Sequence, residues 1–455
     1  MVAELGDLVA ELRATVVELN ESLSARDLRI AELEKLLEES RRSGKRQSAP
    51  FSKGTPKDEP ARPGRKSGDE HGRHGHRAVP VRPDRELAAP LPGCCPECGG
   101  DVDHERDTEQ WQVELPEARP VVTRFVVGVG RCRRCGKRVQ GRHRDQTSDA
   151  LGAAGSQVGP RVKAWAAWLH YELGLSFGKC ARLLGRLGIP VTAGALSSGA
   201  QTTGAALVPV HQEIVRRVNA ARMVVMDETG WRVGGFGAWL WVATAEGVTA
   251  YNVADGRGFT EATILLDDDY DGVLVRDGWA PYRKYEAATH QTCTAHLLRR
   301  AGEMIEGNPS WARGTPRQVK DILLEGLAAR DLGARRRKAT AAELTDRIEL
   351  LAEQAHPYDA NRKLVAHLYN ERLALFTFLT HPGVDATNWR GEQAVRPAVV
   401  NRKVWGGNRT WRGANTQSRV TSVLRTAAQQ GIDAIDWLTR YARAPDHALV
   451  PLFTQ

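Results

Sequence analysis

Residues 2–37 carry a seven-residue hydrophobic repeat. Ten of its eleven a and d positions are aliphatic, and Arg26 is the exception. Mostly β-branched residues at a with Leu at d favour a parallel two-stranded coil. One helix packed on its own protein is the alternative, but a strict 3.5-residue repeat argues against it. We therefore expect residues 1–40 to form a coiled-coil dimerisation helix, which gives at least a homodimer.

The periodic pattern is lost after residue 40 and returns in the middle of the chain. Residues 41–88 are rich in Arg, Lys, Gly, Ser and Pro, which predicts a flexible basic linker. Its three histidines between residues 71 and 76 are interpreted as solvated or phosphate-contacting. Residues 149–220 have helical periodicity with a break at 188–190. This predicts either a helix-turn-helix DNA-binding segment or helices packed around a catalytic core.

Short apolar runs in residues 221–300 predict the order β-β-β-α-β-α-β. Asp227 follows the first strand, expected at 223–225, and Asp277 ends the fourth. This is the ribonuclease H arrangement, in which the first and fourth strands are adjacent. Residues 301–385 predict a helical insertion, and residues 386–455 a last helix and a basic C-terminal region. Asn388 is expected to cap that helix, Glu392 to lie in its first turns and Pro397 to end it or to fall near its end.

Two strand-end aspartates and a helical glutamate match the needs of a two-metal phosphoryl-transfer site. Hard divalent cations prefer carboxylate oxygens, and two ions about 4 Å apart can contact both the attacking and the leaving oxygen of a phosphodiester. Asp227, Asp277 and Glu392 are therefore the candidate catalytic residues and ligands of two Mg²⁺ (or Mn²⁺) ions. Glu371 and Asp385 are alternative third ligands. A single aspartate at a strand end more often caps a loop.

The cysteine spacing predicts a structural zinc site. Cys95 and Cys98 form one Cys-x-x-Cys pair, and Cys132 and Cys135 form another 33 residues later. A glycine follows each pair, and four thiolates complete a tetrahedral zinc site. Alternating residues at 109–129 predict a hairpin between the pairs, so residues 89–148 are expected to form a zinc ribbon. Cys94 competes with Cys95, but only Cys95 gives the x2 spacing.

The distribution of charge along the chain suggests a polyanionic partner. The net charge is +9; residues 1–40 have four basic and ten acidic side chains, whereas residues 41–85 have thirteen and five. A basic arm before a basic body suggests DNA, although a solvated linker would look the same. No apolar run approaches the ~18 residues of a membrane span, and no signal peptide is expected. A soluble, cytoplasmic, nucleoid-associated protein is therefore expected. The candidate DNA contacts are Arg133, Arg134, Arg396, Arg402, Lys403, Arg409 and Arg412.

Several blocks of the sequence resemble those of a known family. They are the N-terminal coil, the Cys-x-x-Cys pairs, Met-Asp-Glu-Thr at 226–229, Arg-Asp-Gly-Trp-Ala-Pro-Tyr at 276–282, Cys-Thr-Ala-His-Leu-Leu-Arg-Arg at 293–300 and Glu-Gln-Ala-Val-Arg-Pro at 392–397. In this order they resemble the transposases of insertion sequence family sixty-six, within the Asp-Asp-Glu class. The last block departs from the family pattern, since Gly391 precedes Glu392 and Gln393 replaces an arginine.

The resemblance implies a multidomain α/β protein with a ribonuclease H-like mixed-sheet core and a helical insertion before the glutamate. It implies binding of terminal inverted repeats and target DNA, cleavage at the element ends and strand transfer. Asp227, Asp277 and Glu392 would hold two Mg²⁺ ions, and accessory proteins of the element are possible partners. The alternatives are a non-catalytic zinc-ribbon DNA-binding protein derived from a transposase and a ribonuclease H-type nuclease without strand transfer.

Overall fold

The computed structural model describes residues 78–117, 119–148, 150, 157–444 and 451–453. The predicted coiled coil at 1–40 and most of the linker at 41–88 lie outside these residues. The chain divides into two compact units, Met1–Leu115 and Pro116–Gln455. The boundary between them falls inside the predicted zinc module at 89–148.

Two short strands flank the second cysteine pair. β1 (Val129–Arg131) pairs antiparallel with β2 (Arg138–Gln140). The predicted hairpin at 109–129 is wrong, because residues 111–115 and 121–127 form no strand and their apolar side chains, such as Val113 and Val121, are 80% and 94% exposed. Alternating residues form a strand where a neighbour pairs with the backbone and one face is covered. The described residues provide neither for these segments.

A run of helices precedes the main sheet, as the periodicity at 149–220 predicts. Side-chain oxygens of Ser176 and Thr192 cap two of them by accepting a backbone N–H in the first turn. Ala164, Ala200 and Ile214 from three of these helices lie in the same hydrophobic core as the sheet. Packing around the core is therefore the interpretation that the structure favours. The elements are α2 (Pro160–Ala167), the π-helical turn η3 (Trp168–Glu172), α3 (Phe177–Arg186), α4 (Ala193–Ala206) and α5 (Val208–Asn219).

The central sheet has five strands in the order β5-β4-β3-β6-β7. β3, β4 and β5 are antiparallel neighbours, whereas β6 is parallel to β3 and β7 is parallel to β6. The first and fourth strands of the sheet are thus adjacent, as predicted. The strands are β3 (Met223–Val233), β4 (Phe236–Ala245), β5 (Val248–Ala254), β6 (Val273–Arg276) and β7 (Thr289–Thr292).

The connections within the sheet are shorter than predicted. The two helices predicted between the strands are single turns, α6 (Phe259–Ala262) and the 3₁₀ turn η4 (Ala280–Lys284). β7 ends at Thr292, so Cys293 and His296 belong to the start of the next helix and not to the strand. The first turn of this helix therefore holds both side chains at the end of β7.

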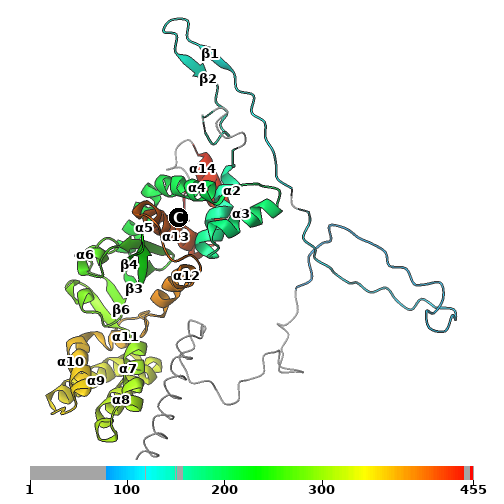
Figure 1. Cartoon of the computed structure of the whole chain (residues 1–455). Helices are drawn as coiled ribbons and strands as arrows, with labels where there is room; N and C mark the ends of the chain where they lie inside the picture. Colours follow the sequence, from blue (N-terminus) through cyan, green and yellow to red (C-terminus); the bar gives the residue numbers. More distant parts are fainter. Residues whose placement is uncertain (1–77, 118, 149, 151–156, 445–450, 454–455) are drawn as a thin grey trace, which may run out of the picture. The chain divides into compact units, whose positions relative to one another are not determined.

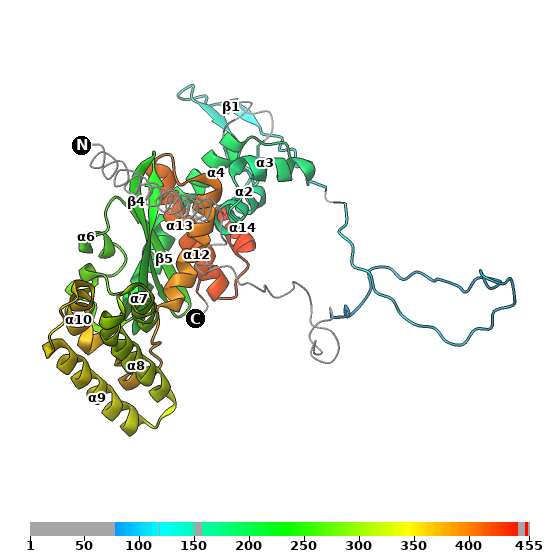
Figure 2. The ribbon, with the colours of Figure 1, turned by 60° about the horizontal axis from the view of Figure 1, so that its bottom comes forward.

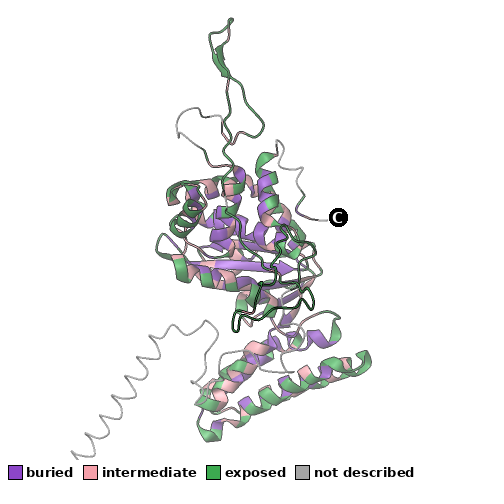
Figure 3. Ribbon diagram, turned by 90° about the vertical axis from the view of Figure 1, so that its right-hand side faces the viewer, coloured by how far each residue is buried: buried purple, intermediate pink, exposed green. Residues whose placement is uncertain are grey.

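Both faces of the sheet are covered, so alternate strand residues enter different cores. Met226 and Trp241 pack in the larger core with α5 and the C-terminal helices, and Trp231 and Val242 pack with α12 (Trp389–Trp405). Figure 3 shows buried residues along the strands and on the helix faces turned toward them. Asp227 lies four residues before Trp231 in β3, so the two side chains are on the same face of the sheet, the one that α12 covers.

Helix α13 (Trp411–Gln429) protects the exposed edge of the sheet. Hydroxyls of Ser418, Ser422 and Thr426 accept the backbone N–H groups of Val253, Tyr251 and Thr249 at 3.0, 2.8 and 3.2 Å. Four residues of a helix rise about 6 Å, which is close to the rise of two residues of a strand. Hydroxyls four residues apart in α13 can therefore meet backbone N–H groups two residues apart in β5. Donors of an edge strand left unpaired would invite pairing with another chain. Figure 1 shows α13 beside the sheet.

The predicted helical insertion has a hydrophobic core of its own. Leu323, Leu344 and Leu368, one from each of three helices, are buried in it, and Leu297 of α7 joins them. The insertion therefore begins with α7, before residue 301. Figure 2 shows these helices grouped away from the sheet. They are α7 (Thr294–Gly307), α8 (Gly314–Ala328), α9 (Ala334–Glu353) and α10 (Asp359–Glu371).

The last helices differ from the prediction at one point. Pro397 lies in the interior of α12, which continues to Trp405. A proline there removes one backbone hydrogen bond of the helix, but Ala394 and Ala398 on either side of it pack in the core and keep the helix continuous. Gly431, with a left-handed φ of +69°, separates α13 from α14 (Ala434–Arg443). Among the described residues, no helix is both long and apolar enough to cross a membrane.

Candidate functional site

The strand register places Asp227 and Asp277 level with each other. Val225 pairs with Val275 across the parallel strands β3 and β6, and each aspartate lies two residues further on. Side chains two residues apart in a strand share a face, so both carboxylates are on the same side of the sheet. Asp277 directly follows β6, as predicted. The predicted end of the first strand is wrong, because Asp227 lies inside β3 and pairs with Val242 of β4.

The two aspartates share an electrostatically unfavourable environment. Burial, with the carboxylates of Glu228 and Asp277 nearby, raises the pKa of Asp227 to about 8. Asp277 Oδ1 accepts the backbone N–H of Trp279 at 2.9 Å, which fixes its orientation. Carboxylates arranged in this way are stabilised by a shared proton or by a cation between them. The donor set is the oxygen-only set that Mg²⁺ and Mn²⁺ prefer.

Asn388 attaches the start of α12 to the two elements that hold the site. Its backbone N–H donates to Cys293 Sγ at 3.2 Å, and its Nδ2 donates to the Met226 carbonyl at 3.2 Å. It occupies the N-cap position, but its side chain makes no cap bond, contrary to prediction. A Cβ on Gly391 would lie 2.3 Å from Asn388 Oδ1. The glycine before Glu392 is thus required by the buried Asn388.

Glu392 lies on the exposed side of the first turn of α12, next to His296. The distance from Glu392 Oε1 to His296 Nε2 is 3.5 Å, and the glutamate side chain is 48% exposed. The neighbouring Cys293 side chain and Glu392 raise the pKa of His296 to about 9, against the effect of burial. The charge of His296 also favours the ionised form of Asp227. His296 therefore connects the glutamate electrostatically with the aspartate pair.

A cavity of about 230 Å³ opens beside these residues. Asp277 and Trp279 line it from the end of β6, His296 and Arg300 from α7, and His367 from the insertion. Sequence reasoning assigned no role to His296, Arg300 or His367. The only available signal was the position of the first two in the Cys-Thr-Ala-His-Leu-Leu-Arg-Arg block. The cavity places three basic side chains next to a candidate catalytic aspartate.

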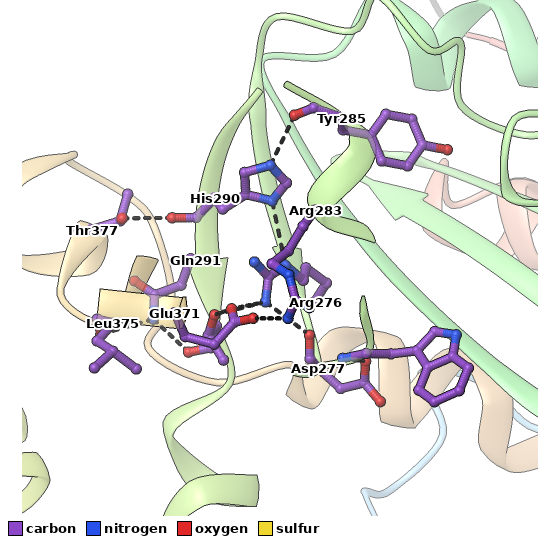
Figure 4. A network of polar contacts seen from close by, with 11 residues as sticks. Arg276, Asp277, Arg283, Tyr285, His290, Gln291, Glu371, Leu375 and Thr377 are labelled. Carbon is purple, nitrogen blue, oxygen red and sulfur yellow. Dashed lines mark hydrogen bonds and ion pairs between the residues drawn. The ribbon is translucent and has the colours of Figure 1, made fainter. Parts of the chain in front are cut away.

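The two alternative third ligands are engaged elsewhere. Glu371 is fully buried and accepts hydrogen bonds from Arg283 at 2.8 Å, from the Thr292 hydroxyl at 2.6 Å and from Arg276. Figure 4 shows Glu371 with Arg276 and Arg283 beside Asp277. Asp385 accepts from Trp389 Nε1 at 3.0 Å and from Arg390 Nε at 3.2 Å. Glu392 is therefore the best-placed third acid.

The three predicted ligands are not gathered into one cluster. In the parts of the chain that the structure describes, no three His, Cys, Asp or Glu side chains lie close enough together to hold a metal ion. Asp227 and Asp277 are neighbours across two strands, whereas the Glu392 carboxylate is turned toward His296.

The cysteine pairs each form the same turn. The Cys95 carbonyl accepts the N–H of Gly99 at 2.8 Å, and the Cys132 carbonyl accepts that of Gly136 at 2.9 Å. Both glycines have left-handed φ values, +75° and +72°, which a side chain would disfavour. Backbone hydrogen bonds from Cys98 and Glu97 lower the pKa of Cys95, and those from Cys135 and Arg134 lower the pKa of Cys132. Each turn is thus suited to a zinc-bound thiolate.

The predicted DNA contacts divide into two kinds. Arg402 Nη1 donates to the Thr229 hydroxyl at 3.0 Å and to the Gly230 carbonyl, so it joins α12 to β3. The others have exposed side chains, near the second cysteine turn or on and after α12. These are Arg133, Arg134, Arg396, Lys403, Arg409 and Arg412.

Comparisons with known proteins identify a relative and a family model that match this chain. An uncharacterized protein of Sinorhizobium fredii, y4qI, is 24% identical over 320 residues, which cover 62% of this chain and 58% of the relative. The chain thus matches little more than half the length of that relative. A family model described as "Transposase IS66 family" matches residues 155–416, which contain the sheet, the insertion and all three candidate acids. The chain therefore belongs to the IS66 family of transposases.

Proposed function

We propose that this transposase binds the ends of an insertion element and catalyses metal-dependent DNA cleavage and strand transfer. The observation that carries the proposal is the level placement of Asp227 and Asp277 on adjacent parallel strands, with α12 bringing Glu392 to the same face. The strand order β5-β4-β3-β6-β7, with three antiparallel strands followed by two parallel ones, supports a ribonuclease H-like core.

Asp227, Asp277 and Glu392 would hold two Mg²⁺ or Mn²⁺ ions. When bound, such ions lower the pKa of the attacking water or hydroxyl and stabilise the leaving oxygen. Trp279 orients Asp277 through its backbone N–H, and Asn388 fixes the start of the Glu392 helix. The positive charge of His296 offsets part of the charge of the three acids.

DNA binding would use the exposed basic side chains and the cysteine module. Arg133 and Arg134 lie in the turn of the second cysteine pair, Lys403 lies in the last turn of the Glu392 helix, and Arg409 and Arg412 follow that helix. Phosphate contacts of this kind position a protein on DNA. Cys95, Cys98, Cys132 and Cys135 would bind one structural Zn²⁺. Dimerisation through residues 1–40 and cooperation with accessory proteins of the element complete the proposal.

The proposal is tested with a DNA fragment that carries the repeat flanking the gene. Purified protein is incubated with Mg²⁺ and the fragment, and Asp277→Asn and Asp385→Asn are compared with the wild type. We expect nicks at the repeat ends and joined products from the wild type and from Asp385→Asn. Asp277→Asn should bind the fragment but lose cleavage by about 10³-fold or more, since it removes one member of a group that acts as a unit.

Three other outcomes contradict the proposal in different ways. Binding without cleavage by any of the proteins indicates a non-catalytic DNA-binding protein. Hydrolysed ends that are never joined indicate a nuclease without strand transfer. Loss of cleavage with Asp385→Asn and not with Asp277→Asn moves the site to the other acid.

A further inference from the structure

The turn between β3 and β4 exposes an aromatic side chain that the fold does not use. Gly234 and Gly235 form the two-residue turn, with φ values of +61° and +88°. Phe236, which follows them and pairs with Val233, is 80% exposed. An exposed phenylalanine adds nothing to core packing, and its hydration is unfavourable. We call this turn with Phe236 the β3–β4 tip.

The β3–β4 tip is held rigidly by the loop between α12 and α13. The Gly234 N–H donates to the Asn408 carbonyl at 2.8 Å, and the Asn408 N–H donates to the Arg232 carbonyl at 2.9 Å. Trp231 Nε1 donates to Asn408 Oδ1 at 2.7 Å. A Cβ on Gly407 would lie 2.5 Å from the Arg232 carbonyl, so the two segments touch backbone to backbone. Phe236 is therefore presented on a fixed support.

The surroundings of the β3–β4 tip are basic. Residues 403–412, which include the Asn408 that holds the tip, contain Lys403, Arg409 and Arg412 and no Asp or Glu, and residues 229–242 contain Arg232 and no acid. Arg232, Arg409 and Arg412 are exposed, and Trp411 is 47% exposed. Exposed aromatic rings between arginines are typical of surfaces that contact phosphates and bases together.

We propose that Phe236 stacks on or inserts between bases of the element-end DNA and marks a fixed distance from the cleaved phosphate. This inference rests on the proposed function. Val233, which pairs with Phe236, lies six residue steps after Asp227 in β3, a distance of roughly 20 Å along the strand. At 3.4 Å per base step this corresponds to about six base pairs. Apolar wedges of this type partly unstack a base step.

A protein partner fits the β3–β4 tip less well. A stable protein interface buries about 800 Å² on each partner around an apolar centre. Phe236 is flanked in the chain by glycines, and residues 232–237 and 406–412, which form and hold the tip, expose arginines but no large aliphatic side chain. The chemistry of the β3–β4 tip is that of a base-stacking contact.

The test places 2-aminopurine, a base whose fluorescence rises on unstacking, at successive positions of a duplex carrying the repeat that flanks the gene. The protein is added without Mg²⁺, so that the duplex stays intact. Wild type, Phe236→Ala, Phe236→Trp and Leu373→Ala are compared; Leu373 is an equally exposed side chain (78%) on the insertion. Sedimentation velocity of each protein without DNA and cleavage with Mg²⁺ are measured in parallel.

We expect fluorescence to rise at one or two adjacent positions about six base pairs from the cleaved phosphate. Phe236→Ala should lose this rise and bind about 5- to 150-fold more weakly, the cost of one lost stacking contact. Phe236→Trp should retain both properties, and Leu373→Ala should match the wild type.

Other results overturn the inference. If no position brightens and Phe236→Ala binds and cleaves like the wild type, Phe236 makes no base contact although the proposed function stands. If Phe236→Ala changes only the oligomeric state, the β3–β4 tip contacts protein. If the wild type neither binds nor cleaves the repeat, the proposed function fails and the inference fails with it.

Discussion

At the scale of single residues, buried charge distinguishes the acids that hold the fold together from those available for chemistry. Arg276 is 2% exposed, and its guanidinium bonds with Glu371, with the Thr292 hydroxyl at 2.8 Å and with the Asp277 carbonyl at 3.1 Å. Glu371 therefore neutralises an arginine that directly precedes the candidate catalytic Asp277. Glu392 is half exposed, and within the described chain its ion-pair partner is His296.

Glu371→Ala should destabilise the protein strongly. It leaves Arg276 buried without its counter-charge, which costs about 3–5 kcal/mol of unfolding free energy. Glu392→Ala, at a half-exposed position, should change stability by less than about 1 kcal/mol and abolish cleavage. Denaturant unfolding and the cleavage assay measure the two effects. Equal stability losses in the two variants would contradict these separate roles.

His170 is expected to make stability depend on pH. It stacks between Phe177 and Trp405, with ring centroids 3.9 and 4.6 Å away, and its Nδ1 bonds with the Leu175 carbonyl at 2.7 Å. Burial lowers its pKa to about 4. Between pH 6.5 and 4 the unfolded chain therefore binds more protons than the folded chain, so stability falls as the pH falls through this window.

His170→Phe keeps an aromatic ring and removes this titration. Relative to the variant, the wild type should lose up to about 3 kcal/mol between pH 7 and pH 4, at 1.36 kcal/mol per unit of pKa shift. Unfolding of both proteins followed across this range measures the difference. Parallel stability curves would show that His170 does not contribute.

At the scale of elements, α13 acts as a substitute neighbour for the edge strand β5. Ser418, Ser422 and Thr426 present hydroxyls at four-residue spacing to backbone donors at two-residue spacing. The same hydroxyls of Ser418 and Ser422 also donate to carbonyls one turn earlier in α13. The polar residues of α13 are thus buried because they complete the hydrogen bonding of the sheet.

Ser422→Ala should therefore be costly although the change is small. It leaves the buried N–H of Tyr251 without its acceptor, which costs about 1–3 kcal/mol. Ser198→Ala, at an exposed position of helix α4, should be neutral or stabilising by a few tenths of a kcal/mol, since alanine favours helix. Chemical denaturation compares the two. A neutral Ser422→Ala would mean that the edge of β5 is satisfied in another way.

At the scale of the whole molecule, the longest strand of the sheet, β3, carries the candidate catalytic Asp227 in its interior and the β3–β4 tip at its end. β3 carries Asp227 near the parallel neighbour β6 and continues to Val233 at the turn. The insertion contributes His367 to the cavity beside Asp277 and Glu371 to the support of Arg276. The helical insertion is therefore part of the site and not an independent appendage.

The cysteine module gives a prediction for the full chain. We expect one Zn²⁺ per chain in the wild type and in Cys94→Ser, and loss of zinc in Cys95→Ser, because only Cys95 lies in the turn completed by Gly99. Metal content after dialysis against a weak chelator is the measurement. If Cys95→Ser retained zinc and Cys94→Ser lost it, the zinc ligand would be Cys94 and not Cys95.

The sequence by itself determined what depends on neighbours along the chain. Hydrophobic periodicity gave the helices, the strands and their order, and the spacing of apolar runs and acids led to Asp227, Asp277 and Glu392. It misjudged the length of β3, because the pairing that extends this strand past Asp227 comes from β4. It also predicted strands at 109–129, where alternation finds no covering surface in the described chain.

Only the tertiary structure decided which groups meet. The contacts of Glu371 with Arg276, of Ser422 with Tyr251 and of Asn388 with Met226 each join residues about 95 to 171 positions apart. No local pattern encodes such pairs, since the residues at both ends are ordinary polar side chains in their own segments. The roles of Glu371 as a support and of His296 as the partner of Glu392 follow from these long-range contacts, because burial and charge are set by what the folded chain brings together.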